Sequence, residues 1–406
     1  MQALLLATGE TPKLHPLTAD TPAPLLPVAN RPVLGHAVEL LARQGFKSCV
    51  VSLHHHAGQV EAFLQDGARW GLRLDYALQR APLGDAGALK WAAPQLAETT
   101  LLLPGDALLD LDVAPAAQFH RAHGGLLTAL VYAPPAPPAH PVWLAPDGRL
   151  SLTPLAGPPL ALTGAYLVEP ALLDAIPPHA PCGLAADLIP RLLETVTTVH
   201  AYQVHGYVNP LATFAEYHAA QAAYLDSAAA GTGGGPAATG GGPAIHTLPA
   251  GGSALRHPTL DGRRMGSSVW VGKQNVIHPS VRIRPPVCIG DNCRIGRDVE
   301  LGPHAVVGSH SVIADEATVH ASTILPGTYV GRLVDVNGRI VHHNTLIDAA
   351  TADSTVVADA FLLGPASAQA AGIDLGRVVD AAAAAPLLAA LAPLLLLAGL
   401  AALLAN

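Results

Sequence analysis

The sequence predicts an N-terminal α/β domain with a mostly parallel, Rossmann-like sheet, then a parallel β-helix and an apolar C-terminal helix. Three observations carry this prediction. Strand-like and helix-like stretches alternate over the first 226 residues, aliphatic residues recur every six positions from Val271 to Leu325, and no charged residue occurs from Ala381 to Ala405. A chain of 406 residues is also long enough for two or three domains of ordinary size.

Composition excludes several classes of protein. Half of the residues are hydrophobic and only 13% are charged, which excludes a disordered chain. The net charge of −8 argues against nucleic-acid binding, because no basic surplus exists to neutralise a phosphate backbone. The four cysteines match neither a disulfide framework nor a zinc-ligand spacing, and we expect no secretory signal because no basic residue precedes the short apolar run at residues 3–7. We therefore expect reduced thiols and a cytoplasmic location.

The N-terminal region shows the alternation of a parallel sheet covered by helices. We expect strands at 3–7, 48–53 and 99–103, and a helix at 32–44. The last of these strands leads into Gly105-Asp106. Because ligands of open α/β sheets bind beyond the carboxyl ends of strands, the loops after Ala7 and after Leu103 are the expected binding region.

A stretch rich in glycine, alanine and proline separates the two predicted parts. It covers residues 227–253, and its composition is typical of a flexible linker. We therefore expect an α/β domain at 1–226, a β-helix at 254–348, a connector at 349–380 and the apolar segment at 381–405.

The β-helix prediction rests on a period of six residues that continues without interruption. Glycine often follows the aliphatic residue, as at Gly272, Gly290 and Gly308. Such a period predicts one short strand and one turn per hexapeptide, with stacked coils sharing an aliphatic core. The ten periodic positions are Val271, Ile277, Ile283, Ile289, Ile295, Leu301, Val307, Ile313, Val319 and Leu325.

The uncharged stretch at 381–405 has two interpretations. It is long enough to cross a hydrocarbon core of about 30 Å as a helix, so we predict a membrane anchor close to the chain end. The alternative is a helix buried in an oligomer interface, because Pro386 and Pro393 interrupt the stretch.

Several segments carry a resemblance to a known family. The opening segment Leu6 to Leu41, LATGETPKLHPLTADTPAPLLPVANRPVLGHAVELL, resembles the signature of the sugar-1-phosphate nucleotidyltransferases, also called nucleotide-sugar pyrophosphorylases. Matching segments follow in order: QRAPLGDAGALKWA, GDALLD, FHRAHGG, TGAYLVEPALLDAIP, DLIPRLLE and GYVNPLATFAEY. With the β-helix, their order is similar to the mannose-1-phosphate guanylyltransferase type over residues 1 to about 345.

The resemblance implies a fold and a reaction. It implies a Rossmann-like nucleotidyltransferase domain and a left-handed hexapeptide-repeat β-helix. It also implies that a nucleoside triphosphate and a sugar 1-phosphate react to a nucleotide sugar and pyrophosphate, with Mg²⁺ as cofactor if the protein is active. Such chemistry needs a phosphate-cradling loop, cations on the phosphates and carboxylates on the metal.

The phosphate-binding residues that the resemblance implies are largely replaced. The family's loop G-x-G-T-R aligns with Gly9 to Lys13, where Pro12 has no N–H to donate and Lys13 lacks the bidentate fork of arginine. Ala23 stands where the family has a lysine, and LAGP at residues 155–158 replaces a charged sugar-phosphate contact.

The metal site is also incomplete. Asp106 keeps the position of the family's first metal-binding carboxylate, at the end of a strand. Pro210 stands where the second aspartate belongs, and the neighbouring Asn209 is neutral. One carboxylate makes a poor Mg²⁺ site.

The residues that the resemblance places on the base and the sugar persist better. Nucleotide binding is implied for Ala7, Gly9, Gln79, Gly84, Gly87 and Ala88, and sugar binding for Gly164 and Tyr166. Asp85 replaces a usual threonine between them.

Because the losses fall on phosphate and metal contacts, we favour a pseudoenzyme. It would bind a nucleotide sugar and act as a regulatory or scaffolding subunit, as a homo-oligomer or in a hetero-oligomer with an active homologue. The alternative is an active nucleotidyltransferase that uses Lys13 and Asp106, assisted by Lys90.

Histidines suggest two weaker hypotheses. His54 to His56 cannot all reach one metal ion, because successive strand residues face opposite sides, so we expect a solvated strand end. His304, His310 and His320 leave a hexapeptide acyltransferase as a minor alternative.

Overall fold

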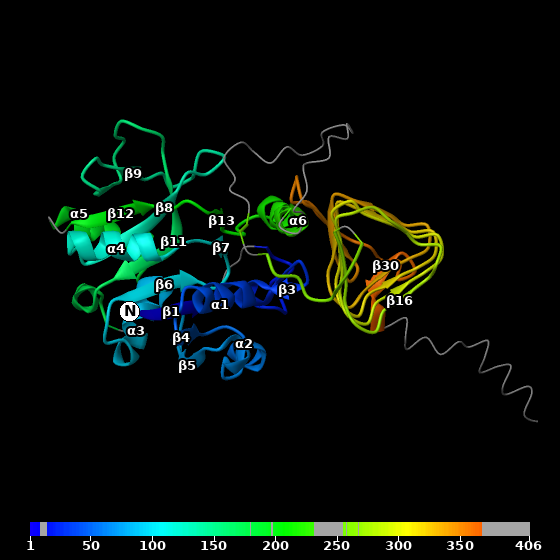
Figure 1. The fold of residues 1–406 in the computed structure, drawn as a ribbon, viewed down its shortest axis with the longest axis horizontal. Coiled ribbons are helices and arrows are strands. Elements are labelled where there is room, and N and C mark those ends of the chain that lie inside the picture. The colour runs from blue at the N-terminus through cyan, green and yellow to red at the C-terminus, as the bar shows by residue number, and fades with distance from the viewer. Residues whose placement is uncertain are drawn as a thin grey trace, which may run out of the picture.

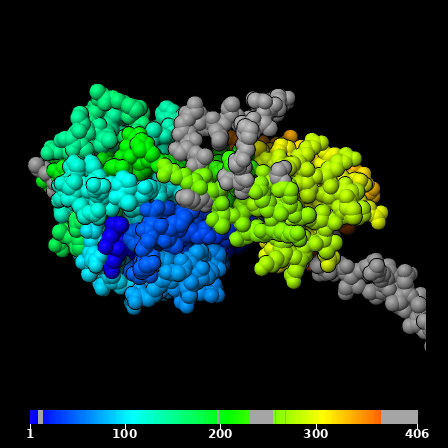
Figure 2. Space-filling view, viewed as in Figure 1, coloured from blue at the N-terminus to red at the C-terminus, as the bar shows by residue number. Residues whose placement is uncertain are grey.

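A computed structural model describes residues 1–8, 14–178, 180–195, 198–230, 255–256, 258–266 and 268–367. The α/β part and a coiled part made of short strands lie side by side, as Figure 1 shows. In the space-filling view the two parts touch over a broad front (Figure 2). The relative position of the two parts is therefore set by direct packing.

A seven-stranded sheet forms the centre of the α/β part, in the order β12-β8-β11-β6-β1-β4-β5. The strands pair in parallel except β11, which runs antiparallel to both of its neighbours. The strands are β1 (Gln2–Ala7), β4 (Ser48–Leu53), β5 (Arg73–Leu78), β6 (Thr100–Pro104), β8 (Leu127–Tyr132), β11 (Ala161–Val168) and β12 (Val199–Gln203).

Helices cover both faces of this sheet, which makes a Rossmann-like α/β fold. Helices α1 (Val33–Arg43), α2 (Ala57–Leu64) and α4 (Ala114–His123) contribute buried residues to one core cluster. Helices α3 (Gly84–Ala92) and α5 (Ile189–Glu194) contribute to the cluster on the other face. Alternating inward side chains of the strands, such as Leu4 and Leu5, divide between the two clusters.

Shorter elements connect these layers. They are the helical turns η1 (Ala23–Leu25), η2 (Ala68–Trp70), η3 (Ala93–Gln95), η4 (Pro170–Ala175) and η5 (Leu184–Leu188), and the strands β2 (Pro27–Val28), β3 (Arg31–Pro32), β7 (Leu108–Asp110), β9 (Trp143–Leu144), β10 (Leu150–Ser151) and β13 (Tyr207–Asn209). The strands expected at 3–7, 48–53 and 99–103 and the helix expected at 32–44 match β1, β4, β6 and α1 within one residue at each end.

Helix α6 (Phe214–Ala230) ends the α/β part and shows where the predicted linker boundary was wrong. The linker was expected from residue 227, but residues 227–230 are helical. Ser227 accepts a hydrogen bond from the N–H of Leu255 at 3.1 Å, and Ala228 packs with Trp270 and Cys288. Contacts with the coiled part therefore extend the helix into an alanine-rich stretch whose composition alone resembles a linker.

The coiled part consists of three sheets of mainly parallel strands, which form the triangular outline at the right of Figure 1. Most pairings join residues 18 positions apart, as in Val269 with Val287 and Val287 with Ala305. One turn of the coil is thus three hexapeptides. The first sheet holds β14 (Arg263–Met265), β15 (Val269–Val271), β18 (Val287–Ile289), β21 (Ala305–Val307), β24 (Thr323–Ile324), β27 (Arg339–His342), β28 (Thr345–Asp348) and β29 (Ser354–Val356). The second holds β16 (Val276–Ile277), β19 (Arg294–Ile295), β22 (Val312–Ile313), β25 (Thr328–Val330) and β30 (Leu363–Pro365), and the third β17 (Arg282–Ile283), β20 (Glu300–Leu301), β23 (Thr318–His320) and β26 (Asp335–Asn337).

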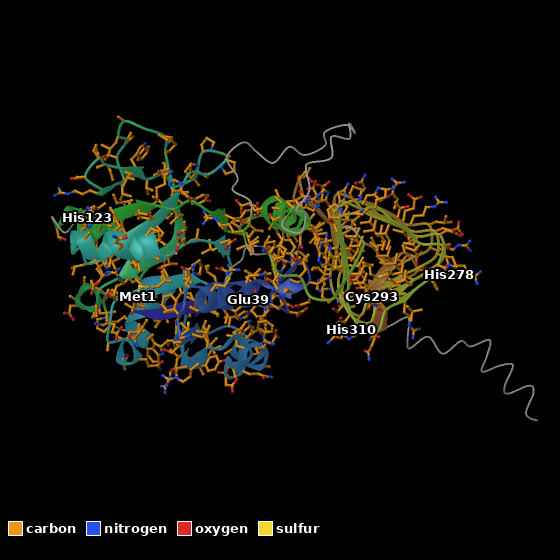
Figure 3. All side chains as sticks on the ribbon, in the orientation of Figure 1. Met1, Glu39, His123, His278, Cys293 and His310 are labelled. Carbon is orange, nitrogen blue, oxygen red and sulfur yellow. The ribbon has the colours of Figure 1, made fainter. Side chains whose placement is uncertain are left out.

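The periodic glycines lie where consecutive coils approach most closely. A Cβ added to Gly290 would lie 2.6 Å from the backbone N of Ser309, and one added to Gly308 would lie 2.4 Å from that of Pro326. The interior holds aliphatic side chains together with Cys293, while His310 lies on the outside (Figure 3). The four cysteines are all buried, free thiols.

The predicted period fails at its last position. Val307 pairs with Ile324 and Ile313 with Val330, so the coil shortens from 18 to 17 residues. Ile324 therefore fills the core position that the six-residue period assigned to Leu325. Leu325 instead joins a cluster that faces the α/β part. Because this coil is one residue shorter, Leu325 lies at the interface with the α/β part and not in the interior of the coiled part.

The end of the coiled part also differs from the prediction. Residues beyond 348 were expected to form a connector, but β29 pairs with β28, and β30 pairs antiparallel with β25. These antiparallel strands use backbone groups that the last parallel strands would leave unpaired. Residues 349–367 thus belong to the coiled part.

No helix among the described residues is long and apolar enough to cross a membrane. The apolar segment predicted at 381–405 lies outside the described residues, as does nearly all of the predicted linker.

Candidate functional site

Strand β1 lies between β4 and β6 at the point where the strand order reverses. The chain proceeds from β1 to β4 and β5 on one side and returns to β6 on the other. The carboxyl ends of β1 and β6 adjoin, since Leu6 pairs with Pro104 and the N–H of Gly105 donates to the carbonyl of Leu6 at 2.8 Å. Ligands of open α/β sheets bind at such a switch point. The two loops named from the sequence therefore meet at one edge.

Gly105 allows this close approach. A Cβ added to it would lie 2.5 Å from the carbonyl oxygen of Leu6 and 2.9 Å from a methyl carbon of Leu34. No other residue fits there without a backbone shift, and the next residue, Asp106, begins the turn into β7.

The loop after β1 can be followed only in part. Ala7 is buried at the end of β1, and Thr8 accepts a hydrogen bond from the N–H of His55 at 2.9 Å. Gly9 and Lys13 lie outside the described residues. His54 to His56 form a half-buried turn directly beside this loop, more enclosed than the solvated strand end expected from the sequence.

Two of the sequence positions that the resemblance assigns to metal ligands come together in space. Strand β13 pairs antiparallel with β7, with Asn209 opposite Leu108. Because the two strands are antiparallel, Pro210, which follows Asn209, lies on the side of Ala107, the residue after Asp106. Topology brings the two positions together, although one of them carries no carboxylate.

Asn209 does not supply a replacement ligand, because its amide is used locally. Its Oδ1 accepts from the N–H of Leu211 at 2.9 Å, and its Nδ2 donates to the carbonyl of Glu216 at 2.9 Å. The Glu216 carboxylate in turn accepts from the N–H of Ala212 and of Thr213. Among the described residues, no group of three His, Cys, Asp or Glu side chains is arranged to hold a metal. These residues do not fit a two-carboxylate Mg²⁺ site.

Gln79 directly follows β5, the edge strand that pairs with β4. It is 3% exposed, its Nε2 donates to Ser52 Oγ at 2.6 Å, and His54 Nδ1 lies 3.3 Å from its carbonyl. Its Oε1 has no partner among the described residues. The side chain is thus held on one side and keeps one free acceptor.

The segment predicted to contact the base packs against residues 182–184. Gly84 has φ +71°, and a Cβ there would lie 2.6 Å from the carbonyl of Cys182. The N–H groups of Ala86 and Gly87 both donate to that carbonyl at 3.1 Å. Ala88 is buried in α3. The tight packing explains why small residues occupy this turn.

Asp85 has a role that the sequence did not reveal. Its Oδ1 accepts from the N–H of Leu184 at 2.5 Å and from that of Ala86 at 2.9 Å. Burial raises the pKa of this carboxyl, and the hydrogen bonds oppose the rise. Asp85 therefore fastens the start of α3 to the start of η5. The only sign of this role in the sequence is that Asp85 stands where the family usually has a threonine.

The two residues predicted on the sugar side lie on β11, near its irregularity between Leu162 and Tyr166. Gly164 has φ +79° and stands over Pro104, because a Cβ added to this glycine would lie 3.3 Å from Pro104 Cγ. Tyr166 is 1% exposed, and burial raises the pKa of its hydroxyl. Its ring belongs to the core under the sheet.

Lys90 and His304 have partners within the fold, whereas His310 and His320 have other surroundings. Lys90 Nζ donates to the carbonyl of Leu173 at 2.8 Å. His304 Nε2 lies 2.7 Å from Asp226 Oδ1, a contact between the coiled part and α6. His310 is exposed, and His320 Nε2 is buried without a partner among the described residues. The three histidines of the acyltransferase hypothesis thus have three different surroundings.

The fold and the switch-point site define a class of α/β proteins that bind nucleotides beyond the carboxyl ends of a parallel sheet. The sequence profile of the family Nucleotidyl transferase matches residues 2–140. N-acetylmuramate alpha-1-phosphate uridylyltransferase of Neisseria meningitidis is 32% identical over 197 residues, which are 47% of this chain and 84% of that protein. The chain belongs to the nucleotidyl transferase family.

Longer relatives match over a smaller share of their length. UTP–glucose-1-phosphate uridylyltransferase of Synechocystis sp. is 31% identical over 216 residues, 48% of this chain and 56% of the relative. Mannose-1-phosphate guanyltransferase of Schizosaccharomyces pombe is 27% identical over 238 residues, 56% of this chain and 65% of the relative. The chain therefore spans little more than half of these relatives.

Solved structures also match the α/β part. HddC from Yersinia pseudotuberculosis superposes with a TM-score of 0.47 at 19% identity, covering 54% of this chain and 97% of that protein.

Proposed function

We propose that this protein is a catalytically impaired nucleotidyltransferase homologue of sugar-nucleotide metabolism that binds a nucleotide sugar, as a regulatory or scaffolding subunit. One observation carries the proposal. Pro210 occupies the position next to Asp106 where the family resemblance implies the second metal carboxylate, and Asn209 is committed to hydrogen bonds with Leu211 and Glu216.

The replaced residues reduce the charge available to bind phosphates and Mg²⁺. Transfer of a nucleotidyl group brings phosphates together, and the reaction depends on Mg²⁺ and on cations that neutralise their charge. Asp106 alone supplies half of the implied metal site, and Ala23 offers no charge to a phosphate. Binding of a nucleotide sugar demands less, because no pyrophosphate has to leave.

An active nucleotidyltransferase remains the second candidate. Asp106 keeps its strand-end position, and Gln79 offers a free buried acceptor directly after β5. In this candidate Lys13 would carry the phosphate contact and Asp106 would hold Mg²⁺.

Pyrophosphate release separates the two candidates. The wild-type protein is mixed with Mg²⁺, each nucleoside triphosphate in turn, and glucose 1-phosphate or mannose 1-phosphate. We expect no turnover, and a rate above about 1 s⁻¹ would contradict the proposal because it lies in the usual enzyme range. The double variant Ala23→Lys with Pro210→Asp, which restores one cation and one carboxylate, is expected to gain activity, with Asp106→Asn in that background as its control.

Calorimetry with UDP-glucose and GDP-mannose tests the binding half of the proposal. We expect saturable binding by the wild type. Neither turnover nor binding would mean that the site is vestigial and that the protein is structural.

The coiled part supports an architectural proposal. We propose that it is a left-handed hexapeptide-repeat β-helix, joined to the α/β domain through the glycine-rich stretch, and that it forms a homo-oligomer or pairs with an active homologue. The 18-residue coil of three short strands supports this proposal. Sedimentation of the purified protein is expected to give a mass above 41.5 kDa.

The uncharged stretch at 381–405 supports a further proposal, a membrane attachment of an otherwise cytoplasmic protein. We expect the full chain to require detergent and a variant lacking residues 381–406 to be soluble without it. Equal solubility of both would contradict the attachment.

A further inference from the structure

We propose that the second sheet of the coiled part binds a second copy of this chain about a two-fold axis. The inference rests on the homo-oligomer of the proposed function and names the face through which two copies join. Strands β16, β19, β22, β25 and β30 form this face, which we call the dimer face. Figure 1 shows β16 and β30 on the side of the triangular outline away from α6.

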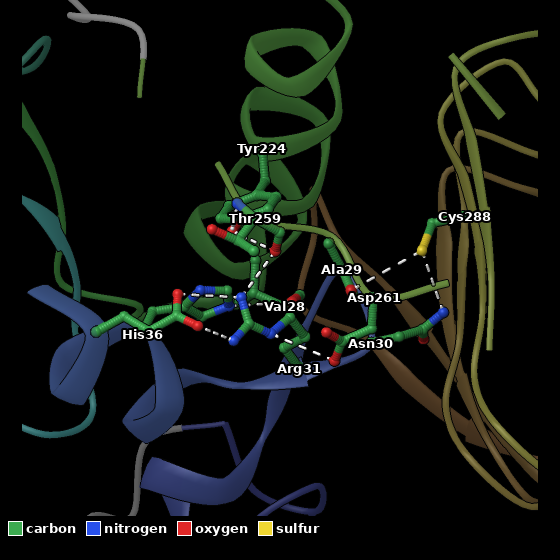
Figure 4. A network of polar contacts seen from close by, with 10 residues as sticks. Val28, Ala29, Asn30, Arg31, His36, Tyr224, Thr259, Asp261 and Cys288 are labelled. Carbon is green, nitrogen blue, oxygen red and sulfur yellow. Dashed lines mark hydrogen bonds and ion pairs between the residues drawn. The ribbon is translucent and has the colours of Figure 1, made fainter. Parts of the chain in front are cut away.

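The three sheets of the coil differ on their outer sides. The α/β part covers the first sheet, where Asn30 donates to the carbonyl of Val307 at 2.9 Å and to the sulfur of Cys288 at 3.4 Å (Figure 4). The third sheet is polar, because Arg282 pairs with Glu300 of the next coil at 2.8 Å and its side chain is 69% exposed. Charged side chains of this kind are well solvated, so the third sheet needs no partner.

The dimer face instead exposes apolar side chains. Strand register aligns Val276, Arg294, Val312 and Tyr329 in one outward row, because the residues that follow them fill the interior. Val276 is 64% exposed, and Phe361, shortly before β30 at the end of the face, is 77% exposed. Exposed apolar side chains that gather on one face mark an interaction surface.

A groove of about 310 Å³ runs along the dimer face beside this row. Its lining includes the small residues Gly296 and Ala314, so a facing chain can approach the backbone closely. The Asp315 carboxylate lies against Gly296 and accepts from the N–H of Arg297 at 2.7 Å. The Arg294 side chain, which also lines the groove, is exposed and has no hydrogen bond or ion pair among the described residues. The groove thus offers an unpaired cation and a fixed carboxylate.

Arg294 and Asp315 make the dimer face complementary to itself. In a two-fold interface every contact between two different residues occurs twice, with the roles of the two copies exchanged. An axis midway between these residues would place each Arg294 opposite Asp315 of the second copy. An apolar partner without an acid would instead bury an arginine with no counter-charge, which is costly. The charges on the face therefore favour a second copy.

The same axis gives compatible neighbours along the rest of the row. Positions 279, 297, 315 and 332 follow the outward row by three residues in successive coils. The axis therefore sets Tyr329 opposite Pro279, and the two valines of the row opposite Arg297 and Arg332. The aliphatic stems of arginine cover apolar surface well, and no two like charges of these rows face each other.

Exchanging the two charges tests the inference. Arg294→Glu and Asp315→Lys each place like charges opposite one another across the axis, whereas the double variant restores both pairs with the charges exchanged. Arg294→Gln removes the charge without reversing it and is the milder change. Arg264→Glu is the matched control, because Arg264 is an exposed arginine of β14 on the first sheet, and its side chain has no hydrogen bond or ion pair in the described part of the chain.

Sedimentation of the full chain at several concentrations measures the dimer. We expect the wild type and Arg264→Glu to give twice the chain mass of 41.5 kDa. Each charge reversal should raise the dissociation constant at least about tenfold, as the loss of a close charge pair in an interface does, and Arg294→Gln should raise it less. The double variant should recover the dimer. Circular dichroism checks that each variant is folded.

A monomeric wild type would overturn the inference, as would a dissociation constant that none of the Arg294 and Asp315 variants changes. Single reversals that the double variant does not rescue would contradict the two-fold register. Calorimetry with UDP-glucose and GDP-mannose separates these outcomes from failure of the proposed nucleotide site, because Arg294→Glu should bind them like the wild type. A wild type that dimerises through this face but binds neither would contradict only the proposed function.

Discussion

At the scale of single residues, backbone approach and burial decide what each position can hold. Gly105 lies where the ends of β1 and β6 approach too closely for a side chain. The Asp85 carboxylate accepts hydrogen bonds from the N–H groups of Ala86 and Leu184. His36 is buried against the carbonyl of Val28 at the edge of the interface between the two parts. Each of these roles gives a measurable expectation.

Gly105→Ala is expected to destabilise the protein by about 2–3 kcal/mol, because its methyl group would overlap the Leu6 carbonyl. Gly58→Ala is the control, since Gly58 lies in α2 with no atom within 4 Å of an added Cβ. It should stabilise by about 0.5–1 kcal/mol. Urea denaturation measures both, and equal stability of the two variants would contradict the steric argument.

His36 is expected to make stability depend on pH. Burial, together with the charge of Arg31, lowers its pKa from 6.5 to about 4. The unfolded chain therefore binds more protons between these values, so this contribution is complete above pH 6.5 and is lost as the pH falls toward 4. The loss amounts to about 3 kcal/mol.

Denaturation of the wild type and of His36→Leu at pH 7.5 and pH 5 isolates this contribution. The variant should be less stable at pH 7.5, yet lose less stability on acidification. Parallel pH profiles of the two proteins would assign the acid sensitivity to other groups, such as His200, His342 and His343, whose pKa values burial also lowers.

At the scale of elements, α6 connects the site to the interface. Its first turn has a capping box, in which Glu216 accepts from the N–H of Thr213 and the N–H of Glu216 donates to Thr213 Oγ1. The carbonyl of Glu216 holds Asn209, and Gln221 further along the helix holds Ala29. The helix thus contacts both Asn209 and the turn at Ala29.

Glu216→Ala is therefore expected to cost about 1 kcal/mol of stability, the usual value of a helix cap. Glu61→Ala on the exposed face of α2 serves as the control and should change stability by less than about 0.5 kcal/mol. Thermal unfolding followed by circular dichroism measures both, and equal melting temperatures of the two variants would exclude a capping role.

At the scale of the whole molecule, the coiled part packs directly against the α/β part. The hairpin at 27–32 and the shared core of Leu26, Leu325 and Ile340 join it to the α/β part. Separation of the two parts would expose these apolar side chains to water.

We therefore expect the two parts to unfold in one transition. Trp270 is the only tryptophan of the coiled part, so replacing Trp70, Trp91 and Trp143 with phenylalanine leaves one fluorescence probe, on the side of the coiled part that packs against α6. Its midpoint in guanidinium should coincide with that of Trp270→Phe, which reports the α/β part. Two separate midpoints would show that the parts are independent.

Three strands and one helix of the α/β part, and the six-residue period of the coiled part, could be predicted from the sequence. Periodicity and composition are local properties, so β4 and α1 could be predicted almost to the residue. The resemblance also implied two metal positions, at Asp106 and at Pro210, and the strands that adjoin these positions, β7 and β13, pair with each other.

Packing of the folded chain was needed to show where one coil shortens, so that Ile324 replaces Leu325 in the core, and how far α6 continues. It was also needed to show the roles of Asp85 and Asn30. The hydrogen bonds of Leu184 to Asp85 and of Asn30 to Val307 join residues 99 and 277 positions apart, and no period or motif encodes them. Which side chain fills a core position depends on the packing of the whole chain, whereas the secondary structure that a segment prefers depends on its own sequence.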